Sequence, residues 1–186
     1  MDMQVGIVER LGDRASEILA NVATALTAAR EHGRPVLFVR VAFRDGAPEI
    51  SANNKAFSSG ALSQSLGETS PSTQIHPALA PRDGEVVITK RRVSAFAGSD
   101  LDVVLRSLAV DSLVLTGIAT SGVVLSTTRQ AADLDFRLTI IHDACADADD
   151  EVHQVLTQKV FPRQATVLSA AQWVAQLDDE VEPSAL

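Results

Sequence analysis

The 186-residue sequence has one cysteine, one tryptophan and no tyrosine. A single cysteine, Cys145, excludes an intrachain disulfide and a zinc site built from several cysteines. The histidines lie far apart in the chain, at His32, His76, His142 and His153. No G-x-G-x-x-G motif occurs, and the small-residue segment GIATSG lacks the Lys-Ser/Thr ending of a phosphate-binding loop. We therefore expect neither a metal ion nor another cofactor.

Basic residues are also few: the sequence has 16 lysines and arginines and 24 aspartates and glutamates. The net charge of −8 disfavours nucleic acid and anionic membranes as the main partners. Apolar runs are no longer than a strand and no signal-peptide core is present, so we expect a cytoplasmic protein. Composition is that of a globular protein, with 46% hydrophobic and 22% charged residues. We expect one domain over residues 1–178 and a frayed acidic tail over residues 179–186.

Hydrophobic patterning alternates between helix and strand periods along the chain. Helices are expected at 13–32, 123–134, 149–160 and 170–177, and one more after Ser99. Strands are expected at 36–43, 85–89, 112–116, 137–142 and 165–168. The Ser-, Gly- and Pro-rich residues 44–81 form a long connection, which in a compact domain is usually functional or mobile. The alternation predicts an α/β fold with a parallel sheet and sites at the carboxyl ends of its strands.

One segment has the shape of a catalytic turn. Residues 111–134 (DSLVLTGIATSGVVLSTTRQAADL) read as a strand, a small-residue turn from Gly117 to Gly122, and a helix from Val123. Such a turn places main-chain N–H groups around one point, where an anion can bind. A nucleophile would be expected on the first helical residue, where the helix dipole lowers its pKa. That residue is Val123, which cannot act as a nucleophile.

The segment TGIATSGVVLSTTRQAADLDF resembles the signature of the isochorismatase-like hydrolases, the cysteine hydrolase superfamily. The resemblance puts the family's cysteine at Val123, so the chain is similar to a member that lacks the nucleophile. Asp2-Met3-Gln4 resembles the family's D-x-Q, and Lys90 in VVITKRRVSAF resembles its lysine. The resemblance implies a three-layer α/β/α fold with a mostly parallel six-stranded sheet, whose first strand we expect to be truncated or missing in this chain. It also implies a small-molecule substrate and a homodimer or tetramer.

The same resemblance implies the site residues. It assigns catalysis to Asp2 and Lys90 beside Val123. Substrate or oxyanion binding falls to Gln4, Ile118, Ala119, Thr120 and Gly122, with a cis peptide bond expected between Ile118 and Ala119.

Several nearby polar groups have simpler interpretations. Thr120 and Ser121 have no evident histidine base in the sequence, so helix capping is the better interpretation of their hydroxyls. Arg91 and Arg92 read as surface charges. Cys145 follows a different strand, 137–142, and small buried cysteines usually only pack.

The beginning of the sequence departs from the family pattern, in which an apolar strand precedes the D-x-Q aspartate. Four or five buried aliphatic side chains are worth about 1.5–3 kcal/mol each. Their sum is comparable to the whole stability of a typical domain, about 5–15 kcal/mol. Either the start codon is assigned downstream of the true one, or the sheet is built without that strand. We favour the first hypothesis.

Three functions compete. Hydrolysis through a thioester needs a thiolate at position 123 and is nearly excluded. General-acid hydrolysis does not need a thiolate. True isochorismatases, which this chain resembles, also lack the cysteine. They cleave a vinyl ether with the D-x-Q aspartate as proton donor. Asp2 would then require a raised pKa, and Lys90 would orient it. Those enzymes carry glycine where this chain has Val123, which takes space from the substrate. The alternative is a catalytically inactive relative that binds a small molecule or acts as a scaffold. Specificity is expected in residues 44–81.

Overall fold

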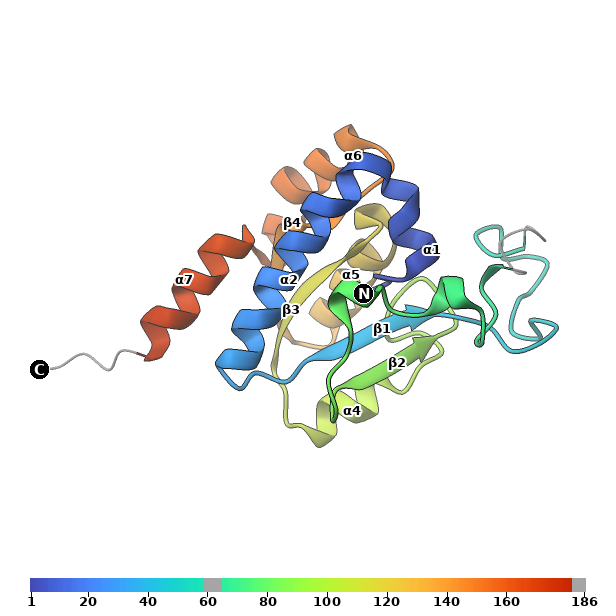
Figure 1. Ribbon diagram of the computed structural model, residues 1–186, viewed down its shortest axis with the longest axis horizontal. Coiled ribbons are helices and arrows are strands. Elements are labelled where there is room, and N and C mark those ends of the chain that lie inside the picture. Colours follow the sequence, from blue (N-terminus) through green and yellow to red (C-terminus); the bar gives the residue numbers. More distant parts are fainter. Residues whose placement is uncertain (59–64, 182–186) are drawn as a thin grey trace, which may run out of the picture.

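A computed structural model describes residues 1–58 and 65–181 of the chain (Figure 1). Its strands are β1 (Leu37–Val41), β2 (Val86–Lys90), β3 (Ser112–Ile118), β4 (Arg137–Ala146) and β5 (Thr166–Leu168). Its α-helices are α1 (Val5–Val8), α2 (Ala15–Glu31), α4 (Leu101–Ser107), α5 (Leu125–Asp133), α6 (Asp150–Val155) and α7 (Ala170–Val181). Short turns of 3-10 or π-helix are η1 (Glu9–Arg14), η2 (Pro71–Thr73), η3 (Pro77–Leu79), η4 (Thr120–Val124), η5 (Leu156–Val160) and η6 (Phe161–Arg163).

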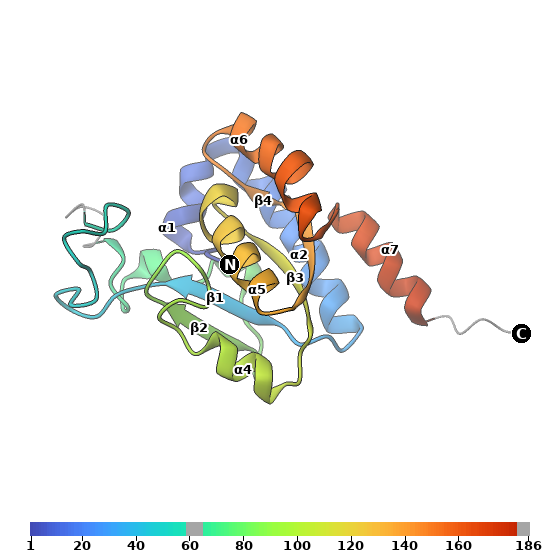
Figure 2. The ribbon, with the colours of Figure 1, turned by 180° about the vertical axis from the view of Figure 1, so that it is seen from behind.

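The elements form three layers, as the sequence predicts. All strand pairs within the described residues are parallel, β1 with β2 and β4 with both β3 and β5. Helices α2 and α7 cover one face, and α4 and α5 cover the other (Figures 1 and 2). Each face has its own hydrophobic core, one around Val22, Ile141 and Trp173 and the other around Leu105 and Ile140. The three-layer α/β/α fold is therefore confirmed.

The described residues form five strands in two sheets, β1–β2 and β3–β4–β5, which agrees with the expected mostly parallel sheet without its first strand. The first two residues lie between these sheets. The Asp2 N–H donates to the Val39 carbonyl at 2.7 Å, and the Ile118 N–H donates to the Met1 carbonyl at 3.3 Å. A Cβ at Gly117 would stand 2.8 Å from the Met1 carbonyl oxygen, so this approach requires glycine. Two residues alone are too few to join the halves into one ladder.

Two elements, β4 and α7, end later in the chain than the sequence predicts, because tertiary contacts extend them. Strand β4 runs on to Ala146, since Cys145 and Ala146 continue the pairing with β3 beyond an irregularity in the register. Helix α7 runs to Val181, three residues into the segment predicted to be frayed. Arg34 pairs with Glu180 at 2.5 Å in that last turn, while residues 182–186 lie outside the described residues.

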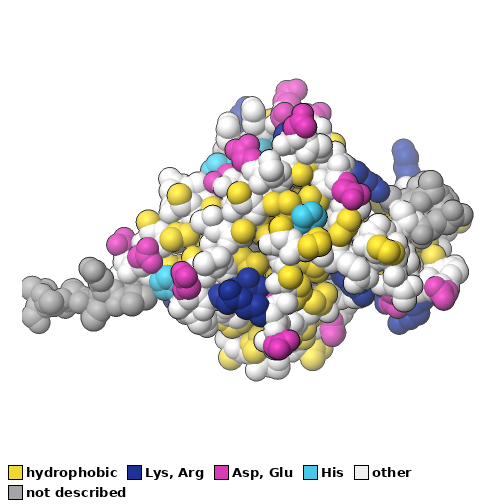
Figure 3. Space-filling model, in the orientation of Figure 1, with side chains coloured by type: hydrophobic (Ala, Val, Ile, Leu, Met, Phe, Trp, Pro, Cys, Tyr) yellow, Lys and Arg dark blue, Asp and Glu magenta, His cyan; other side chains and the backbone are white. Residues whose placement is uncertain are grey.

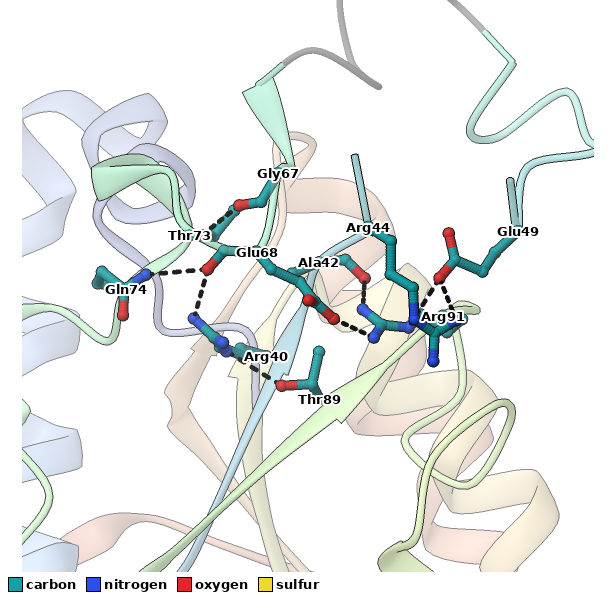
Figure 4. Close-up of polar contacts among 10 residues, drawn as sticks. All are labelled: Arg40, Ala42, Arg44, Glu49, Gly67, Glu68, Thr73, Gln74, Thr89 and Arg91. Atoms are coloured by element: carbon teal, nitrogen blue, oxygen red, sulfur yellow. Dashed lines mark hydrogen bonds and ion pairs between the residues drawn. The ribbon is translucent and has the colours of Figure 1, made fainter. Parts of the chain in front are cut away.

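The long connection after β1 is tied to the sheet through Arg91 (Figure 4). The guanidinium of Arg91 donates to the Glu68 carboxylate and to the Ala42 carbonyl, and its Nε lies 3.5 Å from Glu49. Only 14% of the Arg91 side chain is exposed. The interpretation of Arg91 as a solvated surface charge is therefore wrong. Its acidic partners come from residues far along the chain, which is why the local pattern did not reveal them.

Within the described residues, no helix is long and apolar enough to cross a membrane. On the face seen in Figure 3, lysine and arginine side chains stand in small separate groups among acidic and hydrophobic ones.

Candidate active site

Asp2 and Lys90 form a buried ion pair where the two sheets meet. Lys90 is the last residue of β2, and its Nζ lies 3.0 Å from Oδ2 of Asp2. The same Nζ donates to the Arg92 carbonyl at 2.9 Å. Both side chains are almost completely buried, with 2% of the Lys90 side chain and 7% of the Asp2 side chain exposed. Two residues 88 positions apart in the sequence thus meet as the family motif predicts.

The two carboxyl oxygens of Asp2 differ in their hydrogen bonding. Oδ2 is taken by Lys90, whereas Oδ1 is buried and has no hydrogen-bond partner among the described residues. Burial raises the pKa of Asp2, and the nearby charge of Lys90 opposes that rise without cancelling it. Asp2 also adopts a φ of 56°, a left-handed conformation that non-glycine residues seldom take outside sites that constrain them. The free oxygen is therefore placed to carry a proton.

A cavity of about 200 Å³ opens beside this pair. Asp2 and Lys90 line it together with Val123, the residue at which the sequence analysis expects the family's cysteine. The remaining lining is mostly apolar and comes from α1, η1, β1, the long connection, the segment after β2 and the turn after β3: Ile7, Arg10, Val41, Ala56, Phe57, Leu66, Val93, Ala119 and Gly122. The volume is below the 300–1,000 Å³ of typical drug-sized ligand sites, so only a compact ligand fits.

Arg10 is a site residue that the sequence analysis missed. It lines the cavity and is exposed, and it makes no hydrogen bond or ion pair with any described residue. Lys90 has Asp2 as its partner, so Arg10 is the cation without a partner among the described residues that line the cavity. The only sequence signal was its place eight residues after Asp2, which carries no motif.

The turn after β3 has the expected backbone, but three of the N–H groups in this region have partners within the protein. The Ile118–Ala119 peptide bond is cis, which confirms that expectation. The N–H of Ser121 donates to the Asp147 carboxylate at 2.7 Å, and the N–H groups of Gly122 and Val124 donate to the Ala119 carbonyl. These three N–H groups are satisfied within the protein. The prediction of free N–H groups around an anion is wrong for these three and stays a prediction for Ala119 and Thr120.

The helix after this turn also begins earlier than predicted. The π-helical turn η4 starts at Thr120 and leads directly into α5. Val123 therefore lies inside the first turn instead of opening the helix. The tertiary bond from Ser121 to Asp147, 26 residues away, holds the early start.

Other predicted residues lie away from the cavity. Thr120 is completely buried, and its hydroxyl lies 2.8 Å from Nδ1 of His153, a contact that the sequence did not reveal. Gln4 is also completely buried, with its amide bonded to main-chain groups of Val41 and Thr73. Ile118 belongs to the core around α2. None of the three lines the cavity, so each supports the site's framework.

Cys145 is a buried residue of β4 and does not line the cavity. Burial raises the pKa of its thiol to about 12, so the thiolate is absent near neutrality. Within residues 1–58 and 65–181, no group of three His, Cys, Asp or Glu side chains is placed to hold a metal ion. The expectation that the site needs no metal or cofactor stays a prediction.

Comparison with known proteins shows which family the chain belongs to. A model described as the isochorismatase domain matches residues 1–172. The chain belongs to the isochorismatase family. It is 33% identical to an uncharacterized isochorismatase family protein, YwoC, of Bacillus subtilis over 163 residues, 88% of this chain and 84% of that protein. It is 34% identical to the N-carbamoylsarcosine amidase of an Arthrobacter species over 70% of this chain and 50% of the amidase.

Solved structures agree with this isochorismatase-family fold. An isochorismatase family protein of Burkholderia thailandensis superposes with a TM-score of 0.84 at 29% identity, covering 95% of this chain and 92% of that one. A cysteine hydrolase of Pseudomonas syringae pv. phaseolicola superposes with a TM-score of 0.88 at 22% identity, covering 96% and 90%. The family relatives include named amidohydrolases, which supports a hydrolase.

Proposed function

We propose that this isochorismatase-family hydrolase cleaves a small anionic substrate by general-acid catalysis through Asp2, without a cysteine nucleophile. The observation that carries the proposal is the buried Oδ1 of Asp2, which has no partner among the described residues and lies beside a cavity that Val123 also lines. A carboxyl group with a raised pKa holds its proton nearer to neutral pH, as a general acid must.

In the proposed reaction, the Asp2 carboxyl group protonates the terminal carbon of a vinyl ether. The O–H bond of the acid breaks and a C–H bond forms, leaving a cation stabilised by the ether oxygen. Water adds to the cationic carbon and returns one proton to the Asp2 carboxylate. The hemiketal then collapses to a ketone and an alcohol. Lys90 holds Oδ2 through this cycle, which directs Oδ1 toward the substrate.

Arg10 supports an anionic substrate. A carboxylate on the ligand would find in Arg10 a guanidinium that has no partner in the part of the chain that the structure describes. Charge-assisted hydrogen bonds of this kind are among the stronger ones. The apolar side chains of Phe57 and Leu66 would cover the rest of the molecule. A bound anion near Asp2 would raise the pKa of its carboxyl group further, which favours the acid form.

Amide hydrolysis through a thioester is disfavoured here. The named relatives, N-carbamoylsarcosine amidase and ureidoacrylate amidohydrolase, act on amide-type bonds by their names. In this chain the residue beside the ion pair is Val123, and the one thiol lies in β4 away from the cavity. The retained ion pair and cavity likewise do not favour the inactive, scaffold-like alternative.

The proposal is tested on a panel of small vinyl ethers, esters and amides, each as a carboxylate and as its neutral methyl ester. The wild type should turn over vinyl ether carboxylates, and Asp2→Asn should lower kcat by about 100-fold or more, the usual contribution of a general acid. Asp133→Asn serves as the matched control, because Asp133 is exposed on α5. If no panel member is hydrolysed, or if Asp2→Asn is as active as the control, the proposal is wrong.

A further inference from the structure

The turn between β3 and α5 contains residues that line the cavity and, between them, residues that do not. Ala119, Gly122 and Val123 line the cavity, whereas Thr120 and Ser121 are absent from its wall. Each of these two residues instead makes a hydrogen bond to the part of the chain that follows β4. Because they lie between the lining residues, loss of either bond would free part of the cavity wall.

The bond of Thr120 is made by a completely buried side chain. Its hydroxyl lies 2.8 Å from Nδ1 of His153, which is 33 residues later in the chain. Among the described residues, this ring nitrogen is the one hydrogen-bond partner of the Thr120 hydroxyl. His153 belongs to α6, which packs against η4 (Figure 2). The contact therefore joins two elements that lie far apart in the sequence.

The burial of Thr120 determines in which direction this hydrogen bond runs. A hydroxyl has one proton to donate, and a buried donor without an acceptor costs free energy. Nδ1 of His153 therefore lacks a proton and accepts from Thr120, which places the ring proton on Nε2. Burial lowers the pKa of His153, and the charges of Asp147 and Asp150 oppose this shift without cancelling it. The imidazole is accordingly neutral near neutral pH, as an acceptor must be.

The helix that supplies this acceptor is itself held in place. Asp149 caps α6, since its carboxylate accepts from the N–H groups of Glu151 and Val152. One turn after His153, the hydroxyl of Thr157 donates to the His153 carbonyl at 2.8 Å. The imidazole thus projects from a capped and hydrogen-bonded segment. This segment gives the turn after β3 a fixed support.

We propose that His153 is a positioning residue of the site, whose Nδ1 accepts from Thr120 and thereby holds the turn that forms one wall of the cavity. The two residues act as a pair, because the hydroxyl has no other acceptor among the described residues. Their bond complements the one from Ser121 to Asp147, so that two neighbouring residues of the turn are held from the same part of the chain. This inference goes beyond the proposed function, because it concerns the position of the cavity wall and applies to any reaction at this site.

Two pairs of substitutions separate the hydrogen bond from the space that the side chains fill. Thr120→Ser keeps the hydroxyl, whereas Thr120→Val keeps the shape of the side chain without the hydroxyl. His153→Asn places an amide oxygen near the position of Nδ1, whereas the longer side chain of His153→Gln extends toward the position of Nε2. We expect Thr120→Val and His153→Gln to loosen the turn. Thr120→Ser and His153→Asn are the matched controls and should keep it in place.

A thiol at position 123 reports the movement of the turn. Val123 is 2% exposed, so the thiol of Val123→Cys should react slowly with iodoacetamide and faster when the turn opens. In this background, Thr120→Val and His153→Gln should each raise the alkylation rate about tenfold, and their matched controls less than about threefold. The two substitutions combined should be no faster than either alone, because the same bond is lost only once. Cys145 of β4 is also 2% exposed and serves as the internal reference, whose alkylation rate should not change.

Nitrogen NMR of the imidazole ring checks the direction of the bond in the unmodified chain. Near neutral pH, His153 should be the Nε2–H tautomer, and its Nδ1 signal should shift in Thr120→Val. The inference is overturned if Nδ1 carries the proton, or if His153→Asn and His153→Gln give equal alkylation rates at position 123. It is also overturned if Cys145 reacts faster to the same extent, because the substitutions would then unfold the whole domain. Neither readout requires turnover, so a failure of the proposed reaction would leave this test unaffected.

Discussion

At the scale of single residues, the site depends on the different contacts of the two carboxyl oxygens of Asp2. Asp2 gives one oxygen to Lys90 and keeps the other free beside the cavity. Such an unsatisfied buried oxygen costs free energy in the folded state, about 1–3 kcal/mol for an unpaired polar group. Such an oxygen at the wall of a cavity is consistent with a group that hydrogen-bonds to a bound substrate. The sequence motif predicted the Asp2–Lys90 meeting but could not show which oxygen is free.

Val123 offers a direct residue-scale test of the missing thiol. Val123→Cys would place a thiol on the cavity wall with Asp2 and Lys90. We expect this variant to gain hydrolysis of activated esters and amides that iodoacetamide abolishes, because a thiolate there can attack a bound carbonyl.

Val124→Cys is the matched control for that variant. Val124 is completely buried and does not line the cavity, so its thiol should give no activity. Equal activity of the two variants, or none in Val123→Cys, would show that position 123 does not face a competent site.

Arg10 gives a residue-scale test of substrate charge. Arg10→Gln removes this cation, so KM for carboxylate substrates should rise about 10-fold to 100-fold while KM for the neutral methyl esters stays the same. Arg163→Gln, an exposed arginine away from the cavity, is the control. A rise in KM that is the same for charged and neutral substrates would contradict a carboxylate contact.

At the scale of elements, the turn after β3 is held from outside by Asp147. Burial by itself would raise the pKa of Asp147, but the hydrogen bond from Ser121 and further main-chain N–H groups outweigh it and lower the pKa. The N–H of Asp149 also points to this carboxylate, at 3.4 Å. Asp147 therefore fixes the segment that carries Ala119 and Val123.

Removing this support should loosen the turn. Asp147→Ala should lower the free energy of unfolding by about 1–3 kcal/mol, because the Ser121 N–H loses its charged partner. It should also lower kcat more than it raises KM, since the variant displaces the cavity wall and leaves Arg10 in place. Asp150→Ala, which removes only an exposed ion pair with Arg14, should cost less than about 1 kcal/mol. Chemical denaturation and steady-state kinetics measure both effects, and equal losses in the two variants would refute this role.

The same elements show what the sequence could and could not predict. Helix α2 and strand β3 were predicted close to their true bounds because local periodicity determines them. The early start of η4 and the burial of Arg91 depend on partners far along the chain, Asp147 and Glu68. No local pattern carries such information. The separation of the sheet into two halves was likewise visible only once β1 and β3 were placed.

At the scale of the whole molecule, the parallel sheet explains where the site lies. Lys90 ends β2, and the turn with Ala119 follows β3, so both reach the carboxyl edge that the fold class predicted. The long connection returns to this edge and is anchored by Arg91, which places Phe57 and Leu66 over the cavity. Specificity therefore stays predicted for residues 44–81, now together with Arg10. A homodimer or tetramer also stays a prediction.

The most direct measurement of the central claim is the pH dependence of kcat on a vinyl ether carboxylate. Only protonated Asp2 can donate, so kcat should be constant at low pH and fall tenfold per pH unit above the raised pKa of Asp2. Lys90→Met removes the charge that lowers this pKa, so the fall should move to higher pH. Asp2→Asn should show no such titration. A kcat that rises with pH, or a fall that Lys90→Met leaves in place, would contradict general-acid catalysis by Asp2.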